Sequence, residues 1–159
     1  MSILRSGKRN IIKNGRVMQV FIVGSPLETA MALDPKRLNK QIIEVKQILA
    51  ALNGIDAWSN HPAVLQYRGY ENWLRCYKRL LEIVQSGGKY SIPCQYHDYR
   101  AREATPEWHT QEYYNQMKRR LYTKDKEHYK QWAHLGESQE NWYFVDGEWR
   151  KYVNGKRIE

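Results

Sequence analysis

The sequence predicts a mainly α protein: a compact single-domain bundle of about four helices with a small C-terminal β-hairpin. Three observations lead to this prediction. Apolar residues recur at helical spacing in four stretches, and glycine and proline mark the breaks between them. Strand-like composition on both sides of a hairpin dipeptide, Asp146-Gly147, occurs only near the C-terminus. A chain of 159 residues suits one domain with a single core.

We divide the chain into three parts: a basic N-terminal arm (1–17), a helical domain (18–135) and a C-terminal β-hairpin extension (136–159). The arm has five Lys or Arg residues and no acidic residue, so we expect it to lie on phosphate groups. Met18 could begin the chain equally well. After it, residues 18–23 form a short apolar run of strand-like composition, which Gly24-Ser25-Pro26 ends.

The stretch from 33 to 54 predicts the central helix. Asp34 is expected to cap its N-terminus with its carboxylate, Pro35 suits the first helical position, and Asn53-Gly54 suits the end. Its apolar face repeats at intervals of three and four residues. That face consists of Leu38, Ile42, Val45, Leu49 and Leu52.

The same helix carries a polar row made of Arg37, Gln41 and Glu44 at positions i, i+4 and i+7, flanked by Lys36 and Lys40. A single carboxylate among cationic and amide groups on a rigid element is a candidate chemical site. The alternative is an ordinary solvated helix face, which charged rows commonly form.

A second helix is predicted from Pro62 to about Gln85, with His61 as its cap and Gly69 inside it. Residues 89–104 predict a basic and aromatic surface loop. A third helix is expected to start at Thr105-Pro106, to run to about residue 122 and to turn inward the side chains of Tyr114, Met117 and Leu121.

The last predicted elements are a short helix and the hairpin. The helix covers 126–135, with Asp125 as its N-cap and Gly136 as its stop. Beyond Asp146-Gly147, a second turn is expected at Asn154-Gly155.

The formal net charge of +9 and the pI of about 9.5 favour an anionic partner, with nucleic acid first. No apolar run approaches the roughly 20 residues of a membrane-spanning helix, and no secretory signal is recognised.

Cys76 and Cys94 fit neither a zinc spacing nor a disulfide framework, so we expect reduced thiols in a cytosolic setting. The five histidines form no metal-binding spacing, and no phosphate-binding glycine loop or nucleophile elbow is present. We therefore expect no metal and no cofactor.

Four blocks of sequence resemble the pyrimidine-dimer DNA glycosylase family, which includes phage-type endonuclease V. They follow the patterns LD-x-K-R-L-x-K-Q-x-x-E-x-x-Q-I-L, W-x-N-H-P-A-V, R-G-Y-E-x-x-L-x-x-Y and L-x-x-K-D-x-x-H-Y. The blocks occupy Leu33–Leu49, Trp58–Val64, Arg68–Tyr77 and Leu121–Tyr129, within a resemblance that extends from about Met18 to Trp132.

The resemblance implies a helical protein that binds and kinks duplex DNA, displaces a nucleotide and excises a damaged pyrimidine, with AP-lyase activity following through a Schiff base. Glu44 takes the place of the glutamate that stabilises the cationic sugar, and Gln41 and Met18 complete the implied catalytic set. The nucleophile is either an amine near Met18 or a water that Glu44 activates. The implied DNA-binding residues are Lys36, Arg37, Lys40, His61, Arg68, Lys118, Arg119, Arg120 and Lys124.

Two other hypotheses remain open at this point. The chain could be a catalytically inactive relative that serves as a basic DNA-binding protein, or a virion or assembly component that binds protein instead of DNA. For the glycosylase we expect duplex DNA as the partner, no membrane association, a monomer, and a cytoplasmic location, which is the bacterial host's cytoplasm if a phage encodes the chain.

Overall fold

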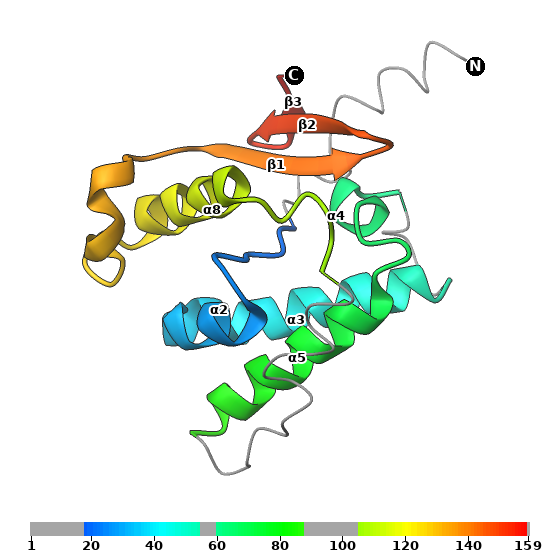
Figure 1. Cartoon of the computed structure of the whole chain (residues 1–159), viewed down its shortest axis with the longest axis horizontal. Coiled ribbons are helices and arrows are strands. Elements are labelled where there is room, and N and C mark those ends of the chain that lie inside the picture. The colour runs from blue at the N-terminus through cyan, green and yellow to red at the C-terminus, as the bar shows by residue number, and fades with distance from the viewer. Residues whose placement is uncertain (1–17, 55–59, 88–104, 159) are drawn as a thin grey trace.

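A computed structural model of the chain describes residues 18–54, 60–87 and 105–158, and it is mainly helical with a small C-terminal antiparallel sheet, as predicted (Figure 1). The helices are α2 (Pro26–Ala32), α3 (Pro35–Leu52), α4 (Pro62–Leu65), α5 (Glu71–Gln85), α8 (Gln111–Lys124) and the 3-10 helix η2 (Lys130–Leu135). The strands are β1 (Glu140–Val145), β2 (Glu148–Val153) and β3 (Lys156–Arg157).

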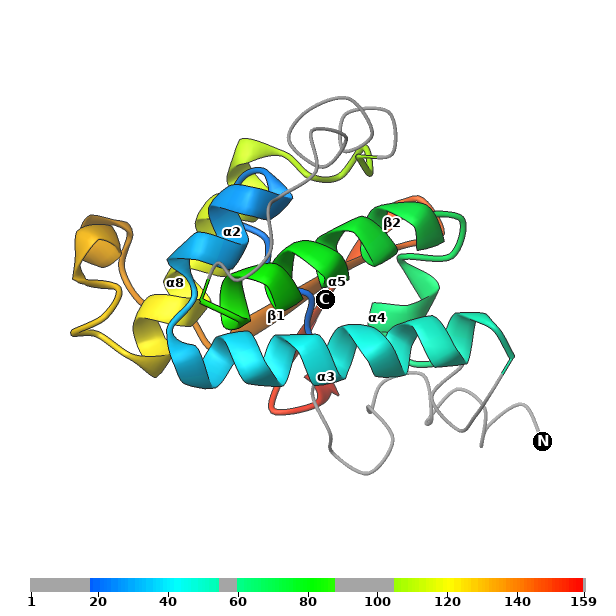
Figure 2. The same cartoon turned by 90° about the horizontal axis from the view of Figure 1, so that it is seen from below.

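The elements form two layers with an extended segment between them. Helices α2, α3 and α5 pack together in one layer, where α3 and α5 lie side by side (Figure 2). The other layer contains α8, η2 and the sheet, and α4 contacts β1. The segment 18–23 passes between the two layers (Figure 1). No helix in the described ranges has the length and apolar character needed to cross a membrane.

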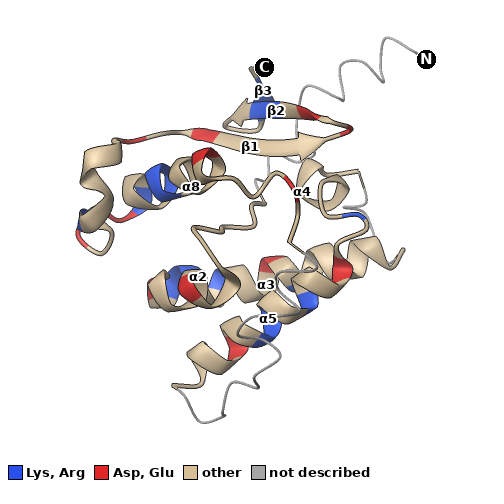
Figure 3. Ribbon diagram, in the orientation of Figure 1, with Lys and Arg blue, Asp and Glu red and all other residues tan. Residues whose placement is uncertain are grey.

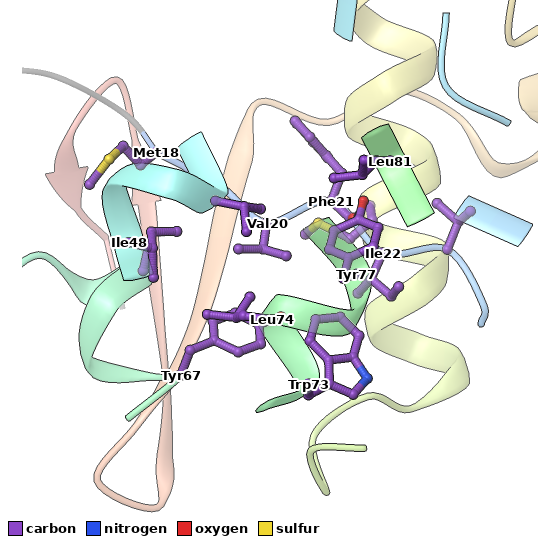
Figure 4. Close-up of a cluster of buried hydrophobic side chains, with 14 of the residues drawn as sticks. Met18, Val20, Phe21, Ile22, Ile48, Tyr67, Trp73, Leu74, Tyr77 and Leu81 are labelled. Carbon is purple, nitrogen blue, oxygen red and sulfur yellow. The ribbon is translucent and has the colours of Figure 1, made fainter. Parts of the chain in front are cut away.

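The segment 18–23 is the centre of the hydrophobic core. Every residue in it is buried, and its side chains meet those of α3 and α5 in the cluster drawn in Figure 4. Although its composition is strand-like, this segment pairs with no neighbouring strand of the described residues. It is nevertheless extended and apolar, and its backbone forms hydrogen bonds to side chains instead, as described below.

Helix α3 follows the prediction closely in its bounds but not in its faces. Pro35 is its first residue, and Gly54 adopts a φ of +82° just beyond its end. Asp34 occupies the N-cap position, yet its carboxylate makes no capping hydrogen bond and instead binds Tyr129 and Arg37. The polar row is not solvated: Gln41 is 1% exposed and Glu44 is 4% exposed. The alternative of an ordinary solvated face is therefore wrong for these two residues.

The predicted helix from Pro62 to Gln85 is two helices, α4 and α5, separated by a turn. His61 caps α4 as predicted, with its Nδ1 accepting from the backbone N–H of Ala63 at 3.0 Å. The interruption lies at Gly69, whose φ of +94° is incompatible with a continuous helix. The helical period of the apolar residues continues across this turn, which is why periodicity alone predicted a single element.

We expect Gly69→Ala to lower the free energy of unfolding by about 1 to 2 kcal/mol, the cost of forcing a residue with a Cβ atom into a left-handed conformation. A Cβ atom added here would meet no heavy atom within 4 Å beyond its neighbours in the chain, so the cost comes from the backbone and not from a clash. Urea denaturation would measure it. The neighbouring exposed substitution Arg68→Ala is the control, and an equal effect of both would contradict the assignment.

The third helix begins later than predicted. Residues 105–110 form turns, and α8 starts at Gln111 with the Thr110 hydroxyl accepting from the N–H of Tyr113 at 3.4 Å. Tyr113 is consequently fully buried, whereas Tyr114, which was predicted to face inward, is only partly buried. The predicted helix at 126–135 is a turn followed by η2, and the Asp125 carboxylate caps the turn by accepting from the His128 N–H.

Both predicted turns of the C-terminal region are present. Asp146 and Gly147 have φ values of +53° and +77°, as a tight hairpin requires, and they join β1 to β2. Asn154 and Gly155 repeat this geometry and join β2 to β3, which gives an antiparallel sheet of order β1-β2-β3. The predicted loop at 89–104 and the basic arm at 1–17 lie outside the described residues.

Candidate active site

The Glu44 carboxylate lies against the backbone of the buried segment. Its Oε2 accepts from the backbone nitrogen of Gln19 at 3.3 Å, and its Oε1 lies 4.0 Å from Nζ of Lys40. Lys40 is 63% exposed in its side chain, so this edge of the carboxylate is close to the molecular surface. Glu44 is therefore held between an inner backbone donor and an outer cation.

Gln41, one helical turn before Glu44, holds the same segment in place. Its Oε1 accepts from the N–H of Phe21 at 2.5 Å, and its Nε2 donates to the carbonyl of Gln19 at 2.9 Å. The amide thus pairs with the segment as a neighbouring strand would. Because both polar atoms are engaged in these bonds, we assign Gln41 a positioning role in place of the predicted catalytic one.

Tyrosines from both layers complete the pairing of the segment. Tyr77 of α5 donates its hydroxyl to the carbonyl of Phe21, and Tyr143 of β1 donates to the carbonyl of Met18, both at 2.6 Å. Burial raises the pKa of both phenols well above the ordinary value, so the hydroxyls remain protonated donors. The excess of tyrosine over phenylalanine in the composition was the available signal for this role, but spacing did not assign it to particular residues.

Gln19 connects the carboxylate to the second layer. Its backbone nitrogen faces Glu44, while its side-chain Nε2 lies 3.3 Å from the Tyr113 hydroxyl of α8 and 3.5 Å from the Trp142 carbonyl of β1. A residue of the segment therefore contacts α3, α8 and the sheet at once. Residues far apart in the chain are needed to build this site.

A group of cations from α3 and α8 surrounds the outer edge of Glu44. Arg37 contacts the Asp34 carboxylate at 3.3 Å and the Lys124 carbonyl at 3.5 Å, which ties the start of α3 to the end of α8. Lys124 is near enough to Arg37, Lys40 and Glu44 to interact with each electrostatically. Figure 3 shows basic residues on α8 toward its C-terminal end.

The pKa of Lys124 is lowered from 10.5 to about 8. Desolvation of the ammonium is the largest cause, even though the residue as a whole is exposed; the neighbouring cations lower the pKa further and Glu44 opposes them. A phosphate at this point would be attracted to the protonated form. Lys124 is therefore a cation whose charge changes just above neutral pH.

We expect DNA affinity to fall as the pH rises from 7 to 9, because Lys124 loses its proton through a pKa of about 8. Loss of one charged contact worth about 1 kcal/mol corresponds to roughly a fivefold weaker Kd. Fluorescence anisotropy with duplex DNA at constant ionic strength would measure it. Lys124→Arg keeps its charge throughout this range and should remove that part of the pH dependence; an unchanged profile would contradict the assignment.

Two residues of the predicted DNA-binding set are buried. His61 is 6% exposed, and its ring caps α4 and packs edge-on against Tyr143. Arg120 is 7% exposed and donates to the Asn141 side chain and the Ser138 carbonyl, joining α8 to the sheet. The DNA contacts that the resemblance implies for these two residues stay a prediction: in this structure His61 is the N-cap of α4, and Arg120 lies on the surface of α8 that faces the sheet.

The remaining basic residues divide into two groups. Lys36 and Arg68 are exposed, and their role in DNA binding stays a prediction. Lys118 and Arg119 lie beside η2: Nζ of Lys118 is 5.7 Å from the centre of the Trp132 ring, and Nε of Arg119 donates to the Leu135 carbonyl at 2.9 Å. These contacts do not bring Lys118 and Arg119 to the cations around Glu44.

The described ranges hold no group of three or more His, Cys, Asp or Glu side chains that could bind a metal ion. Cys76 is buried and forms no disulfide within the described residues, and Cys94 lies outside these ranges. The chemical groups that the site offers are consequently a carboxylate, cations and hydrogen-bond donors.

The fold and the site define a class: a mainly helical protein that holds one carboxylate between a buried backbone nitrogen and a group of surface cations. Residues 18–85 match the model of a family described as pyrimidine dimer DNA glycosylase. The resemblance derived from the sequence motifs is thus confirmed over a stretch that includes the buried segment, α3 and Glu44. No curated protein and no solved structure matches the chain.

Proposed function

We propose that this protein is a DNA glycosylase that excises a damaged or modified pyrimidine from duplex DNA. One observation carries the proposal: within the family-matched stretch, the single carboxylate of α3 is directed at the backbone nitrogen of Gln19 beside a group of cations. The family description supplies the substrate class, and the site supplies groups suited to that chemistry.

In the proposed reaction, Glu44 stabilises the positive charge that develops on the deoxyribose as the bond from C1′ to the base breaks. The departing base leaves with the bonding electron pair and is protonated. A water molecule deprotonated by Glu44 then adds to C1′ and leaves an abasic site. Arg37, Lys40 and Lys124 bind the flanking phosphates, which positions the sugar.

An amine route differs in its nucleophile. Where Met18 precedes Gln19, the Gln19 nitrogen that faces Glu44 is an amide, and an amide nitrogen does not attack C1′. A terminal amine at Gln19 would occupy this place, one at Met18 would lie one residue before it, and either would form a Schiff base followed by β-elimination. The site is therefore compatible with hydrolysis while the peptide bond between Met18 and Gln19 is intact. It is compatible with lyase chemistry if a terminal amine is exposed at Met18 or Gln19.

The test is incubation of the protein with a duplex that contains a cyclobutane pyrimidine dimer, beside the identical undamaged duplex. Strand cleavage that needs subsequent alkali indicates hydrolysis; direct cleavage, with a covalent complex trapped by borohydride, indicates the amine route. Binding of both duplexes without strand cleavage, either direct or after alkali, would overturn the proposal.

That last outcome would support a second function, a DNA-binding protein without catalysis. The observation that favours it is the burial of Glu44, which is only 4% exposed and is covered at its outer edge by Lys40. A sugar can reach the carboxylate only if such covering side chains move. Binding would then depend on the surface cations and would weaken steeply with salt.

A further inference from the structure

A cavity of about 330 Å³ lies where the loop before α8 and the first turn of α8 face the sheet, and two of its lining residues, Tyr113 and Trp142, also contact Gln19. Its volume is at the lower end of the range for small-molecule sites. Five aromatic side chains contribute to its lining: Trp108, Tyr113, Trp142, Phe144 and Trp149. Neither the family-matched stretch nor the proposed reaction accounts for this cavity, since all of its lining residues follow residue 85.

The rings are arranged as a cage around Trp149. The centre of the Trp149 ring is 5.2 Å from those of Tyr113 and Phe144 and 5.8 Å from that of Trp142. The planes are inclined at 34°, 65° and 60°, so the ring faces point in different directions. At these distances the rings contact Trp149, so a ligand would lie against the sides of this cluster that line the cavity and not between its rings.

A nucleobase does not insert between the nearly parallel rings of this lining. A base between two parallel rings needs them about 7 Å apart, which is twice the usual carbon–carbon contact distance. The nearly parallel pair in the lining, Trp108 and Phe144, is inclined at 23° but has its centres only 5.7 Å apart. These two rings already contact each other, so no planar ligand enters between them.

The charge at the cavity is negative. Glu107 and Glu112 are exposed in its lining, which contains no Lys, Arg or His among the described residues. The N-terminus of α8 beside Thr110 favours an anion, and Glu112 in the first turn supplies it. In a chain with a net charge of +9, this end of α8 is acidic, whereas its other end is basic (Figure 3). A ligand that carries phosphate is therefore disfavoured here, and a cation is favoured.

The chain itself provides an example of such binding next to the cavity. The Lys151 ammonium lies 4.5 Å from the centre of the Trp142 ring, within the range of a cation–π interaction. Trp142 belongs to the cavity lining, so at least one ring of the cage already accepts an alkylammonium group.

We propose that this cavity binds a small alkylammonium ion. The aromatic faces would contact the methyl or methylene groups around the charge, and Glu107 and Glu112 would neutralise the charge at the opening. Aromatic cages with adjacent carboxylates suit such cations because ring quadrupoles and anions both attract them. Binding of such an ion can be measured whether or not the protein has the proposed glycosylase activity.

The test uses the full chain and isothermal titration with choline, spermidine and 3,3-dimethyl-1-butanol. The butanol has the shape of choline with a neutral carbon in place of the nitrogen, so it separates charge from apolar contact. We expect choline or spermidine to bind at least ~10-fold more tightly than the butanol, as a cation–π contribution predicts. Tighter binding of choline indicates a quaternary ion, and tighter binding of spermidine indicates a polyamine. Equal binding of all three, or no binding at millimolar concentration, would overturn the proposal.

Variants locate the site. Trp149→Ala removes the centre of the cage and should abolish binding. Glu107→Gln with Glu112→Gln leaves the apolar walls intact and should weaken binding by ~5-fold or more, as for two partly exposed charges. Glu82→Gln with Glu127→Gln, both outside the cavity lining, is the matched control with the same change in net charge. Equal effects of the two double variants on the binding of choline or spermidine would contradict an alkylammonium site.

Discussion

Glu44→Gln is expected to lower the rate of base excision by about 10²- to 10³-fold, the loss found when a preorganised electrostatic contact to a transition state is removed. The amide keeps an oxygen that accepts from the Gln19 nitrogen, so the fold around residue 44 should persist. What it loses is the negative charge opposite the developing cation on the sugar. The same substitution also removes the base that would deprotonate a water molecule.

Single-turnover cleavage of a dimer-containing duplex would measure this effect, since it separates the chemical step from product release. The matched control is Glu82→Gln, which removes an equal charge from α5, where Glu82 pairs with Lys78 at 3.4 Å. DNA affinity should change little in either variant. Full activity of Glu44→Gln on a duplex that the wild type cleaves would exclude Glu44 as the catalytic carboxylate.

Gln41→Leu is expected to lower the free energy of unfolding by about 2 to 6 kcal/mol. The substitution leaves two buried backbone groups, the N–H of Phe21 and the carbonyl of Gln19, without their Gln41 partners, at about 1 to 3 kcal/mol each. The leucine side chain fills a similar volume, so little of the effect should come from a cavity. Such a loss is a large fraction of the roughly 5 to 15 kcal/mol typical of a small protein.

Urea denaturation followed by circular dichroism would give the change in midpoint. Asn39→Leu is the matched control, because it replaces an exposed amide of the same helix whose side chain bonds that of Gln85 at the surface. A Gln41 variant as stable as the control would show that the segment 18–23 does not depend on side-chain hydrogen bonds.

Local sequence signals predicted most of the helix bounds and both turns of the sheet. Pro35 and Gly54 marked the ends of α3, and the dipeptides at 146–147 and 154–155 marked the reversals, because each relies on the conformational preference of one or two residues. The same kind of signal was misinterpreted at Gly69, where the continuing apolar period masked a residue of positive φ. Periodicity reports which side is buried but does not report whether the helix is continuous.

The candidate site was predicted only in part. Glu44 and Gln41 were identified as a row on α3, but their burial was not, since a helical row carries no information about what packs on it. Tyr77 and Tyr143 were missed for the same reason: they meet the segment through contacts between residues 56 and 125 positions apart in the chain. The burial of Arg120 was not predicted either, because the surface of α8 that carries it is covered by the sheet.

The hydrogen bond from Tyr143 to Met18 bears on how the chain is synthesised. A chain that emerges from the ribosome with its N-terminus first exposes the central segment long before β1 exists, so the layer of α8 and the sheet cannot close over it until β1 has been made. Contacts of such long range also slow folding of the released chain. Nascent chains halted before β1 is made should therefore expose apolar surface to chaperones, and the carboxylate should acquire its enclosed setting only in the finished polypeptide.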